Sequence, residues 1–79
     1  MKEIGKVVHF FDKISVAIIE LTAGLKVGDT VTFKSKEEFD QEVTSMQIDH
    51  KEIETAKSGD AIGMKVDKPV HEGVKVELK

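Results

Sequence analysis

Apolar residues recur in this chain in short runs with the spacing of β-strands rather than of helices. Two such runs, 4–11 and 14–21, are separated only by Asp12 and Lys13. A polar connection of this length between two apolar runs is typical of a tight β-hairpin. The start of the chain is therefore predicted to form two paired strands.

A third predicted strand, 30–34, shows strict alternation of apolar and polar residues. Val31 and Phe33 point to one side, and the polar residues around them point to the other. Gly24 and Gly28 in the preceding segment mark a turn that leads into this strand. The pattern is typical of a strand with one buried face, so Val31 and Phe33 are predicted to be core residues.

The segment 39–49 breaks this alternation. Its apolar residues, from Phe39 to Ile48, are separated by four, three and two positions. We interpret the three-residue step near Thr44 and Ser45 as a β-bulge, which bends a strand around a small barrel. A helix is the alternative, because the first two steps also fit helical spacing, but the β-branched residues in the segment favour a strand.

The last third of the chain predicts two more strands. A turn at 58–60 precedes an alternating segment at 61–66, and Pro69 ends that strand because it lacks a backbone donor. Residues 70–78 form the last predicted strand, which Gly73 interrupts. Short strands separated by turns, with no long helix, predict an all-β fold, a small closed barrel of about six or seven strands.

Composition supports a β-rich domain with a small core. Valine, isoleucine and threonine contribute 10, 7 and 5 of the 79 residues, and β-branched side chains favour pleated sheet. A chain of this length forms one domain, so residues 1–79 are predicted to share a single core. The predicted members of that core are Val7, Val16, Ile18, Val31, Phe33, Val43, Met46, Ile62, Met64 and Val66.

The residue types that the sequence lacks exclude several kinds of chemistry. The absence of cysteine excludes disulfides, thiolate metal sites and thiol catalysis. All 12 basic residues are lysines, so no guanidinium is available for bidentate recognition of phosphates or bases. No apolar run approaches the roughly 20 residues of a membrane span, and the first residues lack a signal-peptide pattern. A cytoplasmic protein without membrane contact is expected.

Three blocks of the sequence carry a resemblance to a known family. The chain reads GLKVGDTV at 24–31, VTSM at 43–46 and AKSGDAIGM at 56–64. In this order and spacing, the blocks resemble domain 2 of the translational GTPases, the β-barrel of the elongation factor Tu type. Nearly the whole chain is also similar to small stand-alone translation elongation factor-like proteins. It is similar as well to the barrel appended to collagenase-like peptidases, a family that includes tRNA-modification proteins.

The resemblance implies a candidate binding surface. In elongation factors this domain helps to hold the aminoacyl end of tRNA, and a pocket valine of the family matches Val16. The family's pocket carboxylate, a pocket leucine and a nearby arginine fall on Gln47, Lys65 and His50. The resemblance therefore implies that Val16 stands beside a polar patch made of a different set of side chains.

Two adjacent aromatic residues add to this surface. Neighbours on a strand face opposite sides, so one of Phe10 and Phe11 is predicted to be exposed. An exposed phenylalanine beside His9 and Lys13 marks a contact surface. Phe10, Phe11 and Lys13 are therefore included in the candidate surface.

No catalytic, metal or cofactor site is predicted. The chain has no G-x-x-x-x-G-K-[ST] loop, so binding of GTP or another nucleoside triphosphate is not expected. His9, His50 and His71 are scattered and lack the spacing of a metal motif. No serine has the sequence signature of a nucleophile. The chain is therefore expected to bind rather than to catalyse.

Charge leaves two classes of binding function open. The lysines are interleaved with carboxylates, and the net charge is −3, unlike the basic balance of a dedicated nucleic-acid binder. The resemblance favours a translation-associated module whose partner is RNA, either tRNA or the ribosome. The alternative is a protein-docking or accessory module for a separate enzyme, such as a tRNA-modifying protein, which fits the acidic charge.

Overall fold

All regular secondary structure in the described residues is β. The computed structural model describes residues 2–79, and Met1, the first residue of the predicted 1–79 domain, lies outside the described residues. No helix occurs within 2–79, so the all-β prediction is confirmed and the helix alternative for 39–49 is wrong. The strands are β1 (Lys2–Phe11), β2 (Val16–Leu21), β3 (Leu25–Lys26), β4 (Thr30–Lys34), β5 (Phe39–Glu42), β6 (Met46–Ile48), β7 (Lys51–Ile53), β8 (Thr55–Ala56), β9 (Ala61–Lys65) and β10 (Lys75–Leu78).

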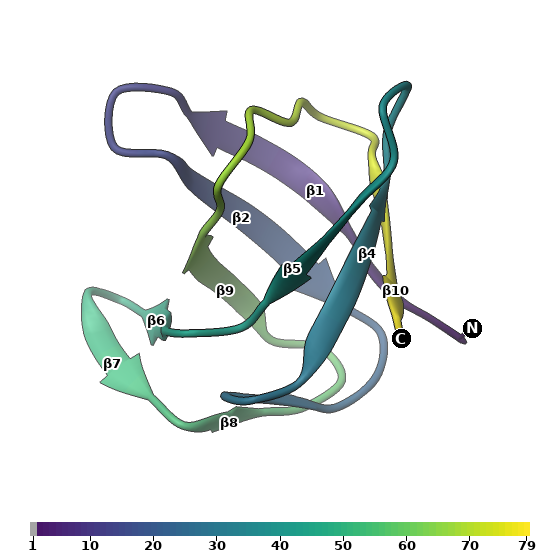
Figure 1. Ribbon diagram of the computed structural model, residues 1–79. Helices are drawn as coiled ribbons and strands as arrows, with labels where there is room; N and C mark the ends of the chain where they lie inside the picture. Colours follow the sequence, from purple (N-terminus) through teal and green to yellow (C-terminus); the bar gives the residue numbers. More distant parts are fainter. Residues whose placement is uncertain (1) are drawn as a thin grey trace.

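Eight of these strands form one curved antiparallel sheet. Their order is β5-β4-β10-β1-β2-β9-β6-β7, and β3 pairs separately with β8. Figure 1 shows the sheet curving into an open half-barrel, with β5 and β7 as its two edges. The prediction of a closed barrel of six or seven strands is therefore wrong.

After β5 the chain leaves the β4–β5 ladder at Val43. The Val43 N–H donates to the carbonyl of Asp29 (2.8 Å), and the Gly28 N–H donates to the carbonyl of Val43 (2.9 Å). These bonds tie Val43 to the turn before β4, and the sheet is open because no ladder joins its edge strands β5 and β7. The predicted strand over 39–49 is consequently two strands joined by 43–45, rather than one strand with a bulge near Thr44 and Ser45.

The irregular pairing lies instead in the long first strand. The register of β1 shifts between Glu3 and Gly5 against β10, and between Val7 and His9 against β2. At Gly5 the neighbouring strand comes so close that a Cβ would lie 2.6 Å from the carbonyl oxygen of Glu20. Only glycine fits there, and the two shifts let β1 bend through the middle of the sheet.

Two four-residue turns hold the small β3–β8 ribbon in place. In the first, the Lys26 N–H donates to the Asp29 carboxylate (3.1 Å), and in the second, the Lys57 N–H donates to the Asp60 carboxylate (3.0 Å). Each turn has the sequence Lys-x-Gly-Asp, and its glycine has a positive φ, of 100° and 94° respectively. The predicted turns before β4 and β9 are confirmed, and both use the same side-chain cap.

The core occupies the concave side of the sheet. Eight of the ten predicted core residues are buried, but Val16 and Ile18 lie on the convex side and are only half-buried. The inward residues of β2 are Ala17, Ile19 and Leu21 instead. In β2 the charged Glu20 lies on the same side as Val16 and Ile18 and marks that side as the outward one, a signal that the predicted core set overlooked. The buried hydrophobic residues are Ile4, Val7, Ala17, Ile19, Leu21, Leu25, Val31, Phe33, Phe39, Val43, Met46, Ile62, Met64, Val66, Val70, Val74 and Val76.

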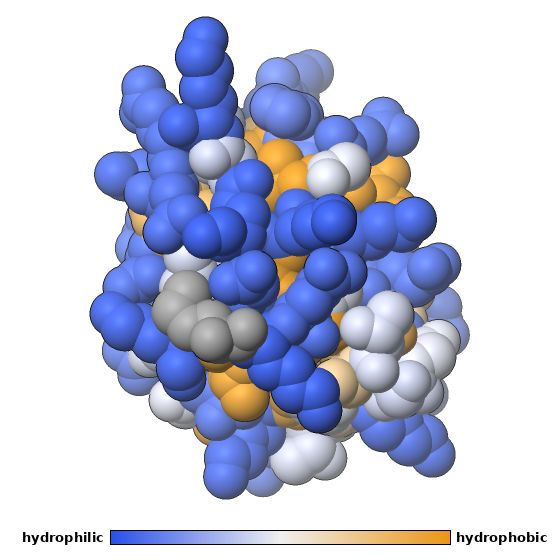
Figure 2. All heavy atoms as spheres, turned by 90° about the vertical axis from the view of Figure 1, so that its right-hand side faces the viewer, coloured by the Kyte–Doolittle hydropathy of each residue, from blue (hydrophilic) through white to orange (hydrophobic). Residues whose placement is uncertain are grey.

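The last predicted strand is shorter than expected. Only 75–78 pair as β10, whereas Val70 and Val74 are buried from a loop in which Gly73 has a φ of 91°. Since Lys2 and Leu78 are cross-strand partners, both ends of the described chain lie on the same side of the molecule. In Figure 2, which faces that side, hydrophilic side chains cover most of the surface.

Candidate binding groove

The convex face of β1, β2, β9 and β6 carries an unusual set of outward residues. Cross-strand pairing places Phe11, Val16 and Lys65 in one row, because Val16 is opposite Phe11 on one side and Lys65 on the other. In the next row, Ile18 is opposite Gly63, which also pairs with Gln47. The centre of this face is therefore apolar, and polar side chains lie at its edges.

A surface groove of about 380 Å³ lies on this face. Its floor is Gly63, where a Cβ would lie 3.3 Å from both the Ile18 Cδ1 and the Val16 Cγ1 atoms. The missing side chain thus leaves a space between two apolar side chains that a methyl group would fill tightly. The lining residues are Phe11, Ile14, Val16, Ile18, Gln47, Asp49, His50, Ala61 and Gly63.

The hairpin between β1 and β2 forms an apolar ridge beside the groove. Ile14 is 59% exposed and Phe11 is 45% exposed, the two highest values among the large exposed hydrophobic residues of the described chain. The ring of Phe11 also contacts the ring of His9 edge-on, with centroids 4.4 Å apart. Exposed apolar side chains gathered on one face mark an interaction surface more often than isolated ones do.

Backbone strain is concentrated at the same place. Within the described residues, the non-glycine residues with positive φ are Ser15 (55°), Asp49 (51°) and His50 (65°). Asp49 and His50 form the two-residue turn between the paired residues Ile48 and Lys51, and both line the groove. Positive φ at both positions defines a type I′ turn, which normally favours asparagine and glycine. Such strain occurs preferentially at functional sites.

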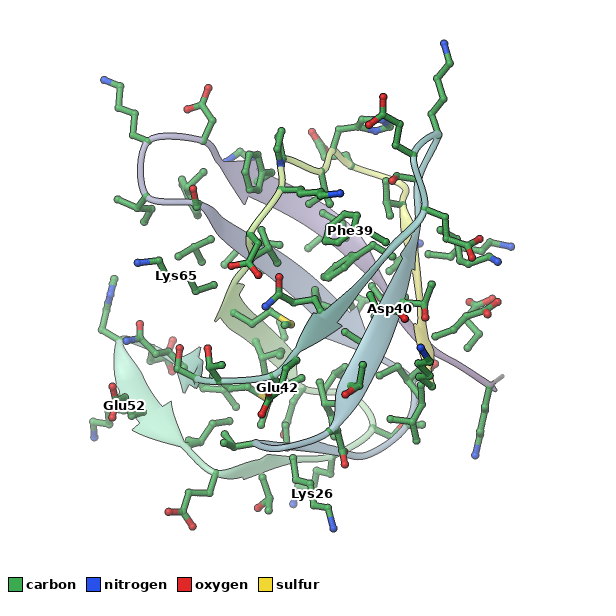
Figure 3. The ribbon with its side chains drawn as sticks, in the orientation of Figure 1. Lys26, Phe39, Asp40, Glu42, Glu52 and Lys65 are labelled. Carbon is green, nitrogen blue, oxygen red and sulfur yellow. The ribbon has the colours of Figure 1, made fainter. Side chains whose placement is uncertain are left out.

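Four of the seven predicted surface residues converge on the groove. Phe11, Val16, Gln47 and His50 line it, although they come from β1, β2, β6 and the β6–β7 turn. Lys65 is exposed beside it as the cross-strand neighbour of Val16. Figure 3 shows Lys65 between the β1–β2 and β6–β7 hairpins.

The other two predicted residues lie apart from the groove. Phe10 points to the opposite side of β1 and packs against the core, as the alternation of strand residues requires. Lys13 is exposed in the β1–β2 turn, outside the lining set. Sequence reasoning missed Ile14 and Gly63, which were assigned to predicted strands. Ile14 lies in the β1–β2 turn rather than in the predicted strand 14–21, and Gly63 lies on the outward face of β9, where a residue without a side chain gave no signal of a groove.

Other hollows, of similar or smaller volume, occur on the described surface. One of about 360 Å³ lies beside Phe39, where the Lys68 ammonium stands 5.6 Å from the ring centroid. Two more, of about 330 and 280 Å³, lie beside Val27 and His71. Across residues 2–79, no group of three or more histidine, aspartate or glutamate residues is arranged to hold a metal ion. The same part of the chain contains no helix that could span a membrane.

In fold, the chain matches the C-terminal domain of a putative U32 peptidase. Two crystal structures of that domain from Geobacillus thermoleovorans superpose on it with TM-scores of 0.92 and 0.91. The first, a selenomethionine variant, is 20% identical and the match covers 98% of this chain and 99% of that one. The second is 18% identical, with 99% and 92% covered. At this level of identity, the likeness establishes the fold.

In sequence, the chain is similar to part of an uncharacterized protease of Methanocaldococcus jannaschii. The two are 47% identical over 78 residues, which is 96% of this chain but only 19% of the protease. No family model matches the chain. Of the resemblances predicted from the sequence, these comparisons support the barrel appended to peptidase-family proteins, and they do not support a stand-alone translation factor.

Proposed function

We propose that this chain is a non-catalytic accessory domain that docks through its groove face onto a peptidase-type protein. The observation that carries this proposal is the exposed ridge of Phe11 and Ile14 beside the groove floored by Gly63. Large apolar side chains that can enter a partner, next to a hollow that can receive one, are the elements that dominate interface energetics. The similar proteins, a protease and a peptidase domain, indicate the class of partner.

The groove offers recognition rather than chemistry. Its polar lining residues, Gln47, Asp49 and His50, stand at the edge of an apolar surface. Neither a serine nor a lysine belongs to the lining set. A role in orienting or retaining a partner therefore fits these side chains better than an active site does.

Binding of RNA is the competing proposal. Lys65, Lys13 and His50 lie around the groove and could contact phosphates, which is the surface that the resemblance to translation factors implies. However, Asp12 and Asp49 share the same two turns, so the local charge is mixed. Phosphate contacts dominate nucleic-acid affinity, and a mixed rim supplies few of them. The protein partner is therefore the stronger proposal.

A direct test uses the Methanocaldococcus jannaschii protease with its matching segment deleted. We expect this chain, added as a separate polypeptide, to bind the truncated protease in a biolayer interferometry assay. Ile14→Ser should weaken that binding at least about tenfold, because it removes an apolar anchor. Val27→Ser is the matched control, since Val27 is 38% exposed but lies outside the groove.

Two results would contradict the proposal. Equal loss of binding in the Val27→Ser control would mean that the groove is not the docking site. Binding of the bait only when ribonuclease is left out of the assay, with a strong dependence on salt, would point to an RNA partner instead.

A further inference from the structure

We infer that the groove binds an extended peptide segment in which an apolar residue stands midway between an acidic and a basic residue. The inference rests on the proposed function, because it states the chemistry of the segment through which a peptidase-type partner is held. Three features of the groove carry it: the width of one strand, an apolar centre, and opposite charges at the two ends.

The groove follows a single strand of the sheet. Its floor, Gly63, lies in β9, and the ladders place β2 on one side of β9 and β6 on the other. Neighbouring strands are about 4.8 Å apart, so the two flanking strands are separated by about 10 Å. A helix with its side chains has a diameter of about 10–12 Å and is too wide to enter between the side chains of these strands. A single extended segment fits this width.

The centre of the groove is suited to an apolar side chain. The space above Gly63 is bordered by two methyl groups, the Ile18 Cδ1 and the Val16 Cγ1 atoms, each 3.3 Å from the position of a Cβ. The exposed ridge of the β1–β2 hairpin continues this apolar border. On the other side of Gly63 lies Gln47, whose amide can donate to and accept from the backbone of a bound segment. An apolar residue in an extended backbone matches both neighbours.

The two ends of the groove carry opposite charges. Lys65 and Ala61 lie two residues from Gly63 in opposite directions along β9, and both are exposed on its outward side. The Lys65 ammonium therefore marks one end. At the other end, Asp49 lines the groove together with Ala61, and Glu20 is the cross-strand partner of Ala61. A bound segment thus meets a cation at one end and carboxylates at the other.

Other charges of the chain do not cancel those at the ends. The ion pairs among the described residues include neither Lys65 nor Asp49. Lys6 stands opposite Glu20 and offsets that carboxylate, but Glu52, the cross-strand partner of Gln47, adds another. Figure 3 shows Glu52 on β7, on the same side of the molecule as Lys65. Charges of opposite sign at defined places fix the orientation of a bound segment.

The spacing of these groups sets the sequence pattern of the segment. Alternate residues of a strand are about 7 Å apart, so the two ends of the groove lie about 13 Å apart, with Gly63 midway. Alternate residues of an extended segment have the same spacing. An acidic residue at Lys65 and a basic residue at Asp49 therefore place the residue midway between them over Gly63. The expected pattern is acidic-x-apolar-x-basic, or its reverse when the segment runs in the opposite direction.

Selection of short random peptides displayed on phage, with the full chain as the immobilised target, tests the pattern. We expect enrichment of peptides in which an acidic and a basic residue are four positions apart with an apolar residue midway. Enriched peptides without this charge order would overturn the inference. So would charges seven or eight positions apart, which a helix would require, or the absence of any enrichment.

Charge exchange between the chain and an enriched peptide tests the contacts. Lys65→Glu should weaken binding of the peptide roughly three- to tenfold in fluorescence anisotropy, and a peptide with lysine in place of its acidic residue should restore it. Asp49→Asn, which keeps a residue that tolerates positive φ, should weaken binding about two- to threefold. Lys36→Glu and Asp67→Asn are the matched controls, because both residues are exposed outside the groove. An exchanged peptide that does not restore binding, or equal losses in the controls, would contradict the assigned contacts and overturn the inference.

These results are distinguishable from the test of the accessory role. If the truncated protease binds and Ile14→Ser weakens that binding, but the selected peptides lack the charge order, only the pattern of the segment is overturned. If the peptides follow the pattern and the truncated protease does not bind, only the accessory role is overturned.

Discussion

Two regions of the outer surface of the sheet differ in the side chains that they expose to solvent. On the side of β4, β5 and β10, charged side chains pair within the chain: the described ion pairs are Lys34–Glu38, Lys75–Glu3 and Lys79–Asp40. On the side of β2, β9 and β6, none of the described ion pairs occurs, and large apolar side chains reach solvent.

The difference shows which face is available to a partner. Thr32 and Asp40 illustrate the first solution, because the Thr32 hydroxyl donates to the Asp40 carboxylate (2.7 Å), which also accepts from Lys79. A face whose polar groups already bond to one another gains little binding free energy from contact with a partner. A face that exposes Phe11 and Ile14 gains from losing contact with water. Substitutions on the two sides of the sheet test this contrast.

The largest effect is expected from removing an aromatic ring under the ion-paired face. Phe33 is fully buried and stacks on Phe39, with ring centroids 5.1 Å apart. Phe33→Ala should lower the free energy of unfolding by about 3 to 5 kcal/mol, as measured by urea denaturation. Phe11→Ala is the matched control on the groove face, and its effect should be clearly smaller, about 1 kcal/mol, because 45% of this residue is already exposed to solvent. Similar losses in the two variants would break the comparison.

Substitution by alanine should affect the stability of the fold differently at two glycines of the sheet. At Gly5 a Cβ meets the backbone of Glu20 at 2.6 Å, so Gly5→Ala should destabilise the fold by about 1 to 3 kcal/mol. At Gly63 the nearest atoms are the ends of two side chains, so Gly63→Ala should leave stability within about 1 kcal/mol of wild type. Gly63→Ala should nevertheless weaken binding to the truncated protease, because the added methyl group fills the floor of the groove. Thermal unfolding and biolayer interferometry of both variants separate the two effects.

The strained turn of the groove should be easy to stabilise. His50 has a φ of 65°, a conformation that glycine adopts without the penalty of about 1 kcal/mol or more that other residues incur. His50→Gly should therefore raise the free energy of unfolding by about 1 kcal/mol. If the rim side chain contributes to docking, the same change should weaken binding to the truncated protease. A loss of stability in His50→Gly would show that the imidazole makes a stabilising contact.

The smallest effect concerns acid stability on the ion-paired face. Hydrogen bonds from Lys79 and from Thr32 lower the pKa of Asp40 from its ordinary value of 3.8. A lowered pKa contributes stability that is present above pH 3.8 and is lost as the pH falls below it. In Asp40→Asn, the stability measured between about pH 5 and pH 2 should therefore fall less steeply with acidification than in wild type. A slope equal to that of wild type would mean that Asp40 is unpaired in solution.

The local pattern of the sequence determined much of this protein. Strict alternation placed the strand at 30–34 with the bounds that β4 has, and it located β9 to within one residue. The short polar connection between the first two apolar runs predicted the β1–β2 hairpin. These elements follow from side-chain alternation and turn chemistry, which act between residues that are close in sequence.

The tertiary structure decided where the sheet ends and which residues surround the outward face of β2. The charged Glu20 marks the outward side of β2, but only pairing with β1 and β9 brings Val16 and Ile18 beside Phe11 and Gly63. The resemblance brought Val16, Gln47 and His50 into one surface, but only the fold adds Ile14 and Gly63 to it. Burial of a strand face is a property of the whole sheet, because it depends on strands that the chain supplies far away in sequence.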